Sequence, residues 1–323
     1  MAGPAEPPTG LPAPLAWLDG RIVREDEPHL RVSDRGFQLG DGVFETLRAR
    51  RGVAIEAEEH LARLRESAAA LAIRLPFDDA ALRVAIRDLL AAAALAGRGD
   101  AGGPVGDAAL RITASRGPLP GRALLPAPGS PPATVVVQAW PFAPPAERLL
   151  REGVRAITST FRREPTSPLA SVKTTSRADH VAARLEAERA GADDAIHLTT
   201  DGRLAESTTA NLFLVREARL LTPALDAGIL AGTTRTWLLA RAAGLGAGLA
   251  GVEEAELVPA DLPAADEAFL SASVLGIVPL TSLDGRPIGT GRPGPLTLAL
   301  REARERWIDA VSRGDPAATG GGS

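Results

Sequence analysis

The 323-residue chain has no cysteine and no tyrosine, and it contains only one methionine. Without cysteine it cannot form a disulfide, a thiolate metal site or a cysteine nucleophile. Without tyrosine it has no phenol to act as an acid, a base or a substrate anchor. The four histidines, His29, His60, His180 and His197, include no pair at metal-ligand spacing, so no metal site is expected. Catalysis must therefore use lysine, acidic or hydroxyl side chains, or a bound cofactor.

The chain also lacks an excess of positive charge and a long apolar run. Asp and Glu number 40 against 36 Lys and Arg, for a net charge of -4, so nucleic acid and anionic lipid are not expected partners. No apolar stretch approaches the ~20 residues that span a bilayer. Residues 1–14 lack the basic start and apolar run of a signal peptide, which predicts a disordered leader on a cytoplasmic protein. A disordered tail is expected over 313–323.

Lysine is nearly absent: of the 36 basic residues, 35 are arginine and one is Lys173. The excess of Ala, Arg, Gly and Pro indicates a bias that replaces lysine by arginine wherever either serves. Arginine cannot replace lysine where an amine must lose its proton and attack a carbonyl. Composition alone leaves two interpretations of Lys173 open, a surface residue that escaped the bias or a reactive amine.

The hydrophobic pattern mixes strand-like and helix-like segments without a regular βαβ repeat, which predicts an α+β fold. We expect a small α+β domain over 15–140, a linker over 141–150 and a larger domain over 151–312. The predicted strands are 16–23 (a pair around the Asp19-Gly20 turn), 43–49, 109–115, 134–140, 154–160, 194–198, 211–215, 219–221, 267–271 and 278–282. The predicted helices are 58–71, 78–95, 178–190, one that begins at Gly232, and 297–309.

Three motifs accompany Lys173. Glu206 begins the segment ESTTANLF, GTTR at 232–235 opens a predicted helix, and Arg63 lies in EEHLARL on another. Each alone has an ordinary structural explanation, such as a helix cap or a solvated charge. Together they meet the needs of pyridoxal 5'-phosphate, which requires an amine for its aldehyde, a carboxylate for its ring nitrogen, and a helix N-terminus with hydroxyls and an arginine for its phosphate.

In order and wording these motifs resemble the class IV aminotransferase family, the fold type IV group of pyridoxal phosphate enzymes. That family includes branched-chain and D-amino-acid aminotransferases and aminodeoxychorismate lyase. The resemblance runs from about Trp17 to Asp309. It is carried by DRGFQLGDGVFETLR (34–48), EEHLARL (58–64), Lys173, GADDAIHLTTDGRLAESTTANLFLV (191–215) and LTPALDAGILAGTTR (221–235), and more loosely by FLSASVLGIVPL (269–280). It implies the two-domain fold of D-amino-acid aminotransferase, bound pyridoxal 5'-phosphate, and a homodimer.

The resemblance also implies roles for individual residues. Lys173 would be the catalytic Schiff-base lysine that carries the proton, and Glu206 would hold the ring nitrogen. Leu230 would lie against the ring face, and Asn211 would either support the site or only satisfy buried strand hydrogen bonds. The expected cofactor-binding residues are Arg63, Glu206, Asn211, Leu230, Gly232, Thr233, Thr234 and Ser273, of which Arg63, 232–234 and Ser273 would bind the phosphate.

The subgroups of the family differ at a few positions. Branched-chain aminotransferases carry a tyrosine five residues after the lysine, where this chain has Ala178. D-amino-acid aminotransferases carry a tyrosine where this chain has Phe44. The lyase carries an arginine four residues after the lysine, as Arg177 is here. It also has a Ser-Arg-Gly…Gly-Arg segment like 115–122, although Pro118-Leu119-Pro120 departs from it.

These differences favour 4-amino-4-deoxychorismate lyase, which forms 4-aminobenzoate and pyruvate by β-elimination. The alternatives are an aminotransferase of D-amino acids or branched-chain amino acids, and an inactive relative that only binds the cofactor. Retention of the single lysine at the Schiff-base position argues against the inactive relative. The expected substrate-binding residues are Phe44, Thr46, Arg111, Arg116, Arg122 and Arg177, the arginines being suited to substrate carboxylates.

Overall fold

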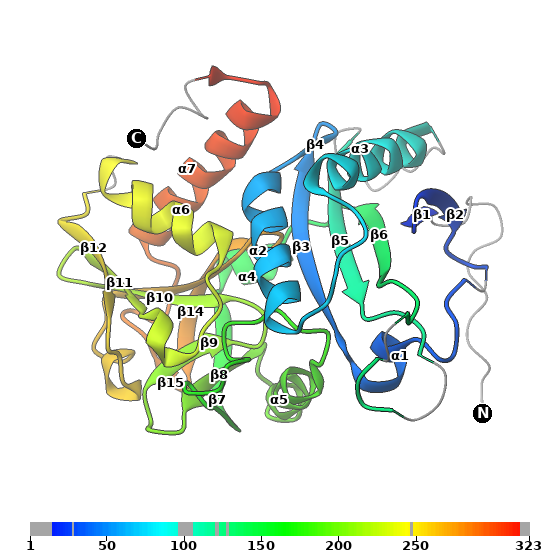
Figure 1. Ribbon diagram of the computed structural model, residues 1–323. Coiled ribbons are helices and arrows are strands. Elements are labelled where there is room, and N and C mark those ends of the chain that lie inside the picture. Colours follow the sequence, from blue (N-terminus) through cyan, green and yellow to red (C-terminus); the bar gives the residue numbers. More distant parts are fainter. Residues whose placement is uncertain are drawn as a thin grey trace, which may run out of the picture.

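The computed structural model describes residues 15–27, 29–95, 106–119, 123–126, 129–245 and 248–316. The leader predicted at 1–14 and the part of the predicted tail beyond 316 lie outside the described residues. Figure 1 shows two β-sheets side by side, each with its own helices, and helix α2 between them. The mixture of helices with antiparallel and parallel strand pairs is the α+β class that the sequence predicts.

The first sheet has six antiparallel strands in the order β2-β1-β6-β5-β3-β4. Their bounds are β1 (Leu15–Leu18), β2 (Arg21–Arg24), β3 (Gly42–Arg50), β4 (Val53–Ala54), β5 (Ala108–Ser115) and β6 (Thr134–Pro141). The predicted turn joins β1 to β2, because Asp19 (φ 45°) and Gly20 (φ 100°) both adopt the positive φ of a tight hairpin.

Two helices, α2 (Ala57–Ala70) and α3 (Asp79–Leu95), pack on this sheet through one apolar stripe each. Leu61 and Leu64 on α2, and Leu82 and Leu89 on α3, are fully buried against strand residues such as Leu110. The stripe on α2 follows the sequence spacing of its leucines, since residues three and four apart share a helix face.

The second sheet has nine strands, and six of them close into a ring. The order is β12-β11-β10-β13-β14-β7-β8-β9, with β15 beside β14, and β9 also pairs with β10. The bounds are β7 (Val154–Arg163), β8 (Asp194–Thr199), β9 (Leu204–Ser207), β10 (Asn211–Arg216), β11 (Arg219–Pro223), β12 (Gly251–Ala255), β13 (Glu267–Ala272), β14 (Gly276–Leu283) and β15 (Arg286–Pro287). The pair that closes the ring is Asn211 opposite Glu206.

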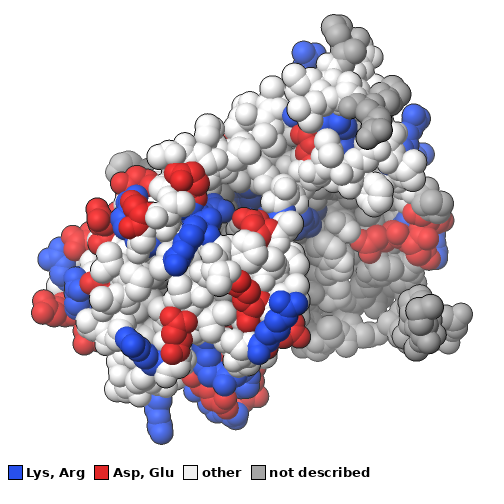
Figure 2. Space-filling model, turned by 90° about the horizontal axis from the view of Figure 1, so that it is seen from below, with Lys and Arg blue, Asp and Glu red and all other residues white. Residues whose placement is uncertain are grey.

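The helices of the second half are α4 (Glu147–Arg151), α5 (Ala178–Arg189), α6 (Thr233–Arg241) and α7 (Pro295–Ser312), with short 3₁₀ turns at Leu225–Ala227, Ala242–Leu245 and Pro259–Asp261. Helix α5 connects the parallel strands β7 and β8, and α6 connects the parallel strands β11 and β12, so the described residues contain two βαβ crossovers that the irregular sequence pattern does not predict. Within the described residues no helix is both long and apolar enough to cross a bilayer. Charged side chains of both signs are interspersed over the face seen in Figure 2.

Short elements account for most differences from the predicted ones. Helix α1 (Arg35–Leu39) is too short to show a periodicity, and it is set instead by Asp34, whose side chain accepts from the Gly36 amide at 2.8 Å. Helix α4 lies within the segment expected as a linker, and β9 is four fully buried residues without alternation. The division into two domains at 141–150 stays a prediction.

Helix α7 carries ion pairs to the first half of the chain. Arg48 of β3 bonds Glu305 at 2.8 Å, and Arg50 lies 2.8 Å from Asp309. Arg304, whose side chain is 2% exposed, bonds the similarly buried Glu56 at 2.6 Å. The last helix therefore holds the two sheets together through charges that are mostly shielded from water.

We expect Arg304→Leu to lower the free energy of unfolding by about 3 kcal/mol, because it leaves the Glu56 carboxylate buried without its partner. Urea unfolding measures the change. Arg306→Leu is the matched control, since Arg306 pairs with Glu302 on the same helix but both side chains are more than 60% exposed; its expected change is within about 0.5 kcal/mol. Equal losses in the two variants would contradict the role given to the buried pair.

Candidate active site

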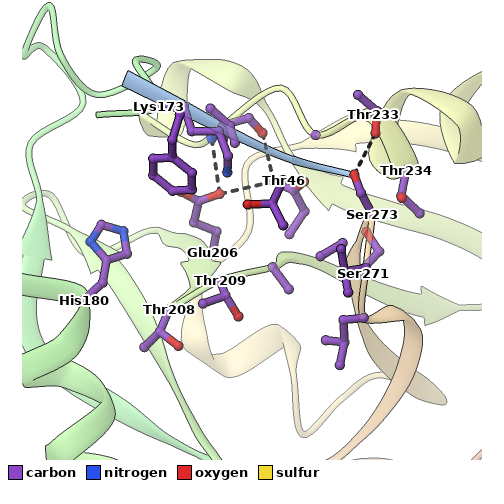
Figure 3. A pocket seen from close by; sticks show the side chains of 18 of the residues that line it. Thr46, Lys173, His180, Glu206, Thr208, Thr209, Thr233, Thr234, Ser271 and Ser273 are labelled. Atoms are coloured by element: carbon purple, nitrogen blue, oxygen red, sulfur yellow. Dashed lines mark hydrogen bonds between the residues drawn. The ribbon is translucent and has the colours of Figure 1, made fainter. Parts of the chain in front are cut away.

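A cavity of about 620 Å³ opens between the two sheets. It brings together every site residue expected from the sequence except Arg116 and Arg122. In Figure 3, Lys173 and Glu206 lie near the middle, Thr233, Thr234 and Ser273 at one end, and His180 and Thr208 toward the other. Residues of strand β3, helix α2 and strand β5 line one side, and the loop of Lys173, the ring closure and the start of α6 line the other.

Backbone hydrogen bonds to β3 position Lys173. The Phe44 amide donates to the Lys173 carbonyl at 3.0 Å, and the Thr175 amide donates to the Gly42 carbonyl at 2.9 Å. Gly42 must be glycine for this contact, because a Cβ there would meet the Ala114 carbonyl at 2.8 Å. The glycine-rich stretch that resembles the family thus serves to seat the lysine segment on the first sheet.

The Lys173 amine lies in a desolvated and electrostatically mixed environment. Its Nζ is 4.7 Å from the centre of the Phe44 ring. Burial lowers the pKa of Lys173 to about 8, and Arg63 and Arg177 lower it as well, whereas Glu45 and Glu206 oppose this shift. A substantial fraction of the amine is therefore neutral near physiological pH, as a nucleophilic lysine requires.

The ring closure of the second sheet orients Glu206. Residues directly opposite in an antiparallel pair share a face, so Asn211 lies beside Glu206 and its Nδ2 donates to Oε2 at 3.2 Å. The Leu230 amide donates to the same oxygen at 3.2 Å, and Asn211 Nδ2 also reaches the Leu230 carbonyl at 2.9 Å. A Cβ on Gly232 would stand 2.1 Å from Asn211 Oδ1, so only glycine fits there. The buried carboxylate is thereby fixed to accept from a protonated ring nitrogen.

The start of α6 is suited to a phosphate. Its N-cap, Gly232, provides no capping side chain, so the first amides of the helix have no side-chain acceptor. Thr234 Oγ1 is buried without a hydrogen-bond partner, and Thr233 Oγ1 lies 2.9 Å from Ser273 Oγ. Free amides and hydroxyls at the positive end of a helix favour an anion. The residues present therefore fit pyridoxal 5'-phosphate at its amine, ring and phosphate positions.

Arg63 reaches this end of the cavity but is already paired with Glu45. Its Nε and Nη2 donate to the two carboxylate oxygens of Glu45, each at 2.7 Å, and Nη1 donates to the Ala231 carbonyl at 2.6 Å. Burial would raise the pKa of Glu45, but hydrogen bonds from Arg63 and His60 outweigh it and lower that pKa to about 2. Glu45 and His60 were not among the expected site residues, although both lie in the motifs quoted above.

The far end of the cavity collects donors suited to a carboxylate. The Arg111 guanidinium stacks 3.8 Å above the Phe44 ring, and Arg177 Nη2 donates to the Thr208 carbonyl at 2.8 Å. Burial lowers the pKa of both arginines, which still remain cationic at neutral pH. His180, 5% exposed, presents an Nε2 without a partner, and burial together with Arg177 lowers its pKa to about 4.

Two expected substrate residues are not placed in the cavity. Arg116 donates from Nε and Nη2 to the Asp41 carboxylate at 2.7 and 3.0 Å, and it also donates to the Leu71 carbonyl. That bidentate pair holds Arg116 outside the cavity of this chain, and its binding of substrate stays a prediction. Arg122 lies outside the described residues. Among the described His, Asp and Glu side chains, no group of three is arranged to hold a metal ion.

Comparison with known proteins gives consistent matches over most of the chain. The family model described as amino-transferase class IV matches residues 42–283. A D-alanine aminotransferase of Bacillus licheniformis is 31% identical, over 90% of this chain and 96% of that one. A branched-chain-amino-acid aminotransferase of Pseudomonas aeruginosa is 28% identical, over 92% and 93%. The crystal structure of a branched-chain amino acid aminotransferase from T.th. with pyridoxamine 5'-phosphate superposes with a TM-score of 0.83 at 29% identity, covering 97% of this chain and 98% of that one.

We expect the Lys173 amine to become reactive near pH 8, not near the ordinary lysine value of 10.5, because the protonated form is unreactive and its pKa is lowered by burial. Acetic anhydride labelling of the cofactor-free protein across a pH series measures this, with the Lys173 peptide quantified by mass spectrometry. A lysine-containing model peptide in the same tubes is the control. A midpoint shared with that peptide would contradict the desolvated environment described for Lys173.

Proposed function

The chain belongs to the amino-transferase class IV family, and from this premise we propose that it is a pyridoxal 5'-phosphate-dependent aminotransferase of D-amino acids or branched-chain amino acids. The observation that carries the proposal is that the only lysine lines the same cavity as a fixed carboxylate, Glu206, and the uncapped start of α6. When bound, the cofactor supplies an aldehyde that exchanges with the substrate amine and a ring that accepts electrons from the α-carbon.

Each part of the cavity has a task in this proposal. The Lys173 Nζ, with a pKa of about 8, is able to accept the proton from the substrate α-carbon and to return it. Glu206 keeps the ring nitrogen protonated, because Asn211 and the Leu230 amide hold its Oε2 in place. The amides and hydroxyls at the start of α6 hold the phosphate and thereby fix the position of the ring relative to Lys173.

The substrate carboxylate would bind at the other end, near Arg111, Arg177 and His180. The two guanidiniums are partly buried and retain donors beyond their bonds to Thr113 and Thr208. A carboxylate satisfies both, since it accepts several hydrogen bonds and carries the opposite charge. The His180 Nδ1 lies 2.8 Å from the Asp179 carboxylate, so the neutral ring donates there and its Nε2 is an acceptor, suited to a donor of the substrate and not to the carboxylate.

The expected lyase activity has less support than transamination. The relatives that match over nine-tenths of the chain are aminotransferases of D-alanine and of branched-chain amino acids. Of the three arginines that favoured the lyase, Arg177 lines the cavity, whereas Arg116 is bound to Asp41 outside it and Arg122 is not described. The lyase therefore remains only as an outcome of the test.

We also propose that the working form is a homodimer, as the family resemblance implies. Apolar side chains stand exposed on and around α1, and Arg35 joins α1 to the neighbouring loop by hydrogen bonds to the Ala123 and Leu124 carbonyls at 2.8 and 2.6 Å. The exposed side chains are Leu30, Val32, Phe37, Leu39, Leu124 and Leu125. Several exposed apolar side chains on neighbouring segments are typical of an interface.

Sedimentation velocity of the intact protein tests the dimer. We expect Phe37→Glu, at a side chain 77% exposed, to convert a dimer into monomers because it places a charge in the interface. Val84→Glu, at an exposed apolar position on α3, is the control and should remain dimeric. A monomeric wild-type protein would overturn the proposal.

The experiment that tests the activity is a half-reaction without keto acid. Protein reconstituted with pyridoxal 5'-phosphate is mixed in turn with D-alanine, D-glutamate, L-glutamate and L-leucine, and the visible absorbance is followed. We expect one donor to convert the bound cofactor to pyridoxamine phosphate, and that donor identifies the stereochemistry. If none reacts and aminodeoxychorismate yields 4-aminobenzoate, the lyase replaces the aminotransferase.

With the reactive donor, we expect Arg177→Met to raise its apparent dissociation constant about 10- to 100-fold, because a charge-assisted hydrogen bond to the carboxylate is lost. The rate at saturating donor should change much less. Arg189→Met, at an exposed position at the end of helix α5, which begins directly after Arg177, and outside the cavity, is the matched control. An unchanged dissociation constant would show that Arg177 does not bind the carboxylate.

A further inference from the structure

Arg63 brings no unbalanced charge to the phosphate end of the cavity. Its guanidinium donates two hydrogen bonds of 2.7 Å to Glu45, whose carboxylate is completely buried. The positive charge of Arg63 is therefore balanced before any phosphate arrives. A phosphate dianion would still need a compensating charge or further donors, because an unpaired buried charge is costly.

His60 is the other group in contact with this pair, and Glu45 fixes one of its protons. The His60 Nδ1 lies 2.7 Å from Glu45 Oε2, and both side chains are fully buried. Glu45 is held ionised by its two hydrogen bonds from Arg63, so it can only accept from His60. The proton of this contact therefore belongs to His60 Nδ1, which leaves Nε2 as the atom that gains or loses a proton.

That free nitrogen faces the two hydroxyls of the phosphate end. The His60 Nε2 is 3.2 Å from Ser273 Oγ and 3.4 Å from Thr233 Oγ1, and these hydroxyls are 2.9 Å apart. Figure 3 shows Thr233 and Ser273 facing each other at this end of the cavity. While Nε2 has no proton, one hydroxyl must donate to it and is lost as a donor to an anion. Once Nε2 is protonated it donates instead, which releases the hydroxyl proton that it had accepted and lets the Thr233–Ser273 pair donate into the cavity.

We propose that His60 takes up a proton from solvent at Nε2 when the cofactor phosphate enters, and that this proton turns Thr233 and Ser273 into phosphate donors. His60 is then a positioning residue. It also supplies the phosphate with a positive charge, because the charge of Arg63 is already neutralised by Glu45. The proposal rests on the proposed function in one respect, the presence of a phosphorylated cofactor at the start of α6.

The charged groups around His60 come from several elements. Glu45 on β3 favours the imidazolium, and Arg63 on α2, with Nη2 3.5 Å from Nδ1, opposes it. The Lys173 amine faces the same two residues from the cavity side, and the Glu56–Arg304 pair lies at the start of α2, with its charges balanced. The phosphate is the group whose arrival changes this balance, and it changes it in favour of the imidazolium.

Calorimetric titration with pyridoxamine phosphate tests the proposal, since this form of the cofactor does not react with Lys173. Titrations at pH 8 are run in buffers of different ionisation enthalpy, which gives the number of protons taken up. We expect the wild-type protein to take up about one proton more than His60→Gln, whose amide cannot be protonated. Its affinity should also fall more steeply above pH 8, by up to about tenfold per pH unit.

His197→Gln is the matched control, because His197 is a buried imidazole outside the cavity and its loss should leave the proton count unchanged. A second measurement does not depend on the His60 variant. The chain has only four histidines, so ¹⁵N-histidine NMR of the wild type resolves them, with assignment by elimination from variants of the other three. We expect His60 Nε2 to move to the protonated shift when pyridoxamine phosphate binds.

The outcomes distinguish a failure of this inference from a failure of the proposed function. If pyridoxamine phosphate does not bind, the proposed function fails. If it binds with the same proton count in the wild type and in His60→Gln, or with His60 Nε2 unchanged in the NMR spectrum, the proton uptake is overturned while the cofactor assignment stands.

Discussion

The site depends on one short contact, in which the segment around Lys173 hydrogen-bonds to the first residues of β3. These two bonds join a loop of the second half to a strand of the first, so the lysine is held by both sheets. The ion pairs of α7 with β3 and with Glu56 at the start of α2 also join the two halves of the chain. Because Phe44 follows directly in β3, one strand seats the backbone of the lysine and also shapes the apolar surface that lowers its pKa.

The second constraint is the closure of the strand ring at Glu206 and Asn211. The closure pairs β9 with β10 as well as with β8, and it fixes that Glu206 and Asn211 stand opposite one another. The ring closure therefore fixes the Glu206 carboxylate through the side-chain amide of Asn211. The same amide also holds the loop leading to α6. The ring-nitrogen partner and the phosphate end are thus connected by Asn211, the Leu230 backbone and Gly232. A disturbance at one end would reach the other through this connection.

The sequence was sufficient to predict the fold class, most long elements and the family, because these depend on local periodicity and on motifs such as GTTR. It was insufficient where long-range partners decide. Arg116 was expected at the substrate, but Asp41, far from it in sequence, binds it first. Glu45 and His60 went unrecognised because their importance arises only when β3 and α2 are packed together. The choice between lyase and aminotransferase is limited for the same reason, since isolated arginines do not reveal which of them face the cavity.

The seating of the only lysine inside the cavity has a consequence for chemical damage. Reducing sugars and other carbonyl compounds form adducts with lysine amines, and on this chain the basic side chains of the surface are all arginine. The one side-chain amine lies in a cavity lined by Phe44 and Glu206, at the position proposed for the cofactor aldehyde. Glycation of a lysine would therefore have to compete with the cofactor for the same nitrogen. The bound cofactor would thus protect the only lysine of the chain from glycation.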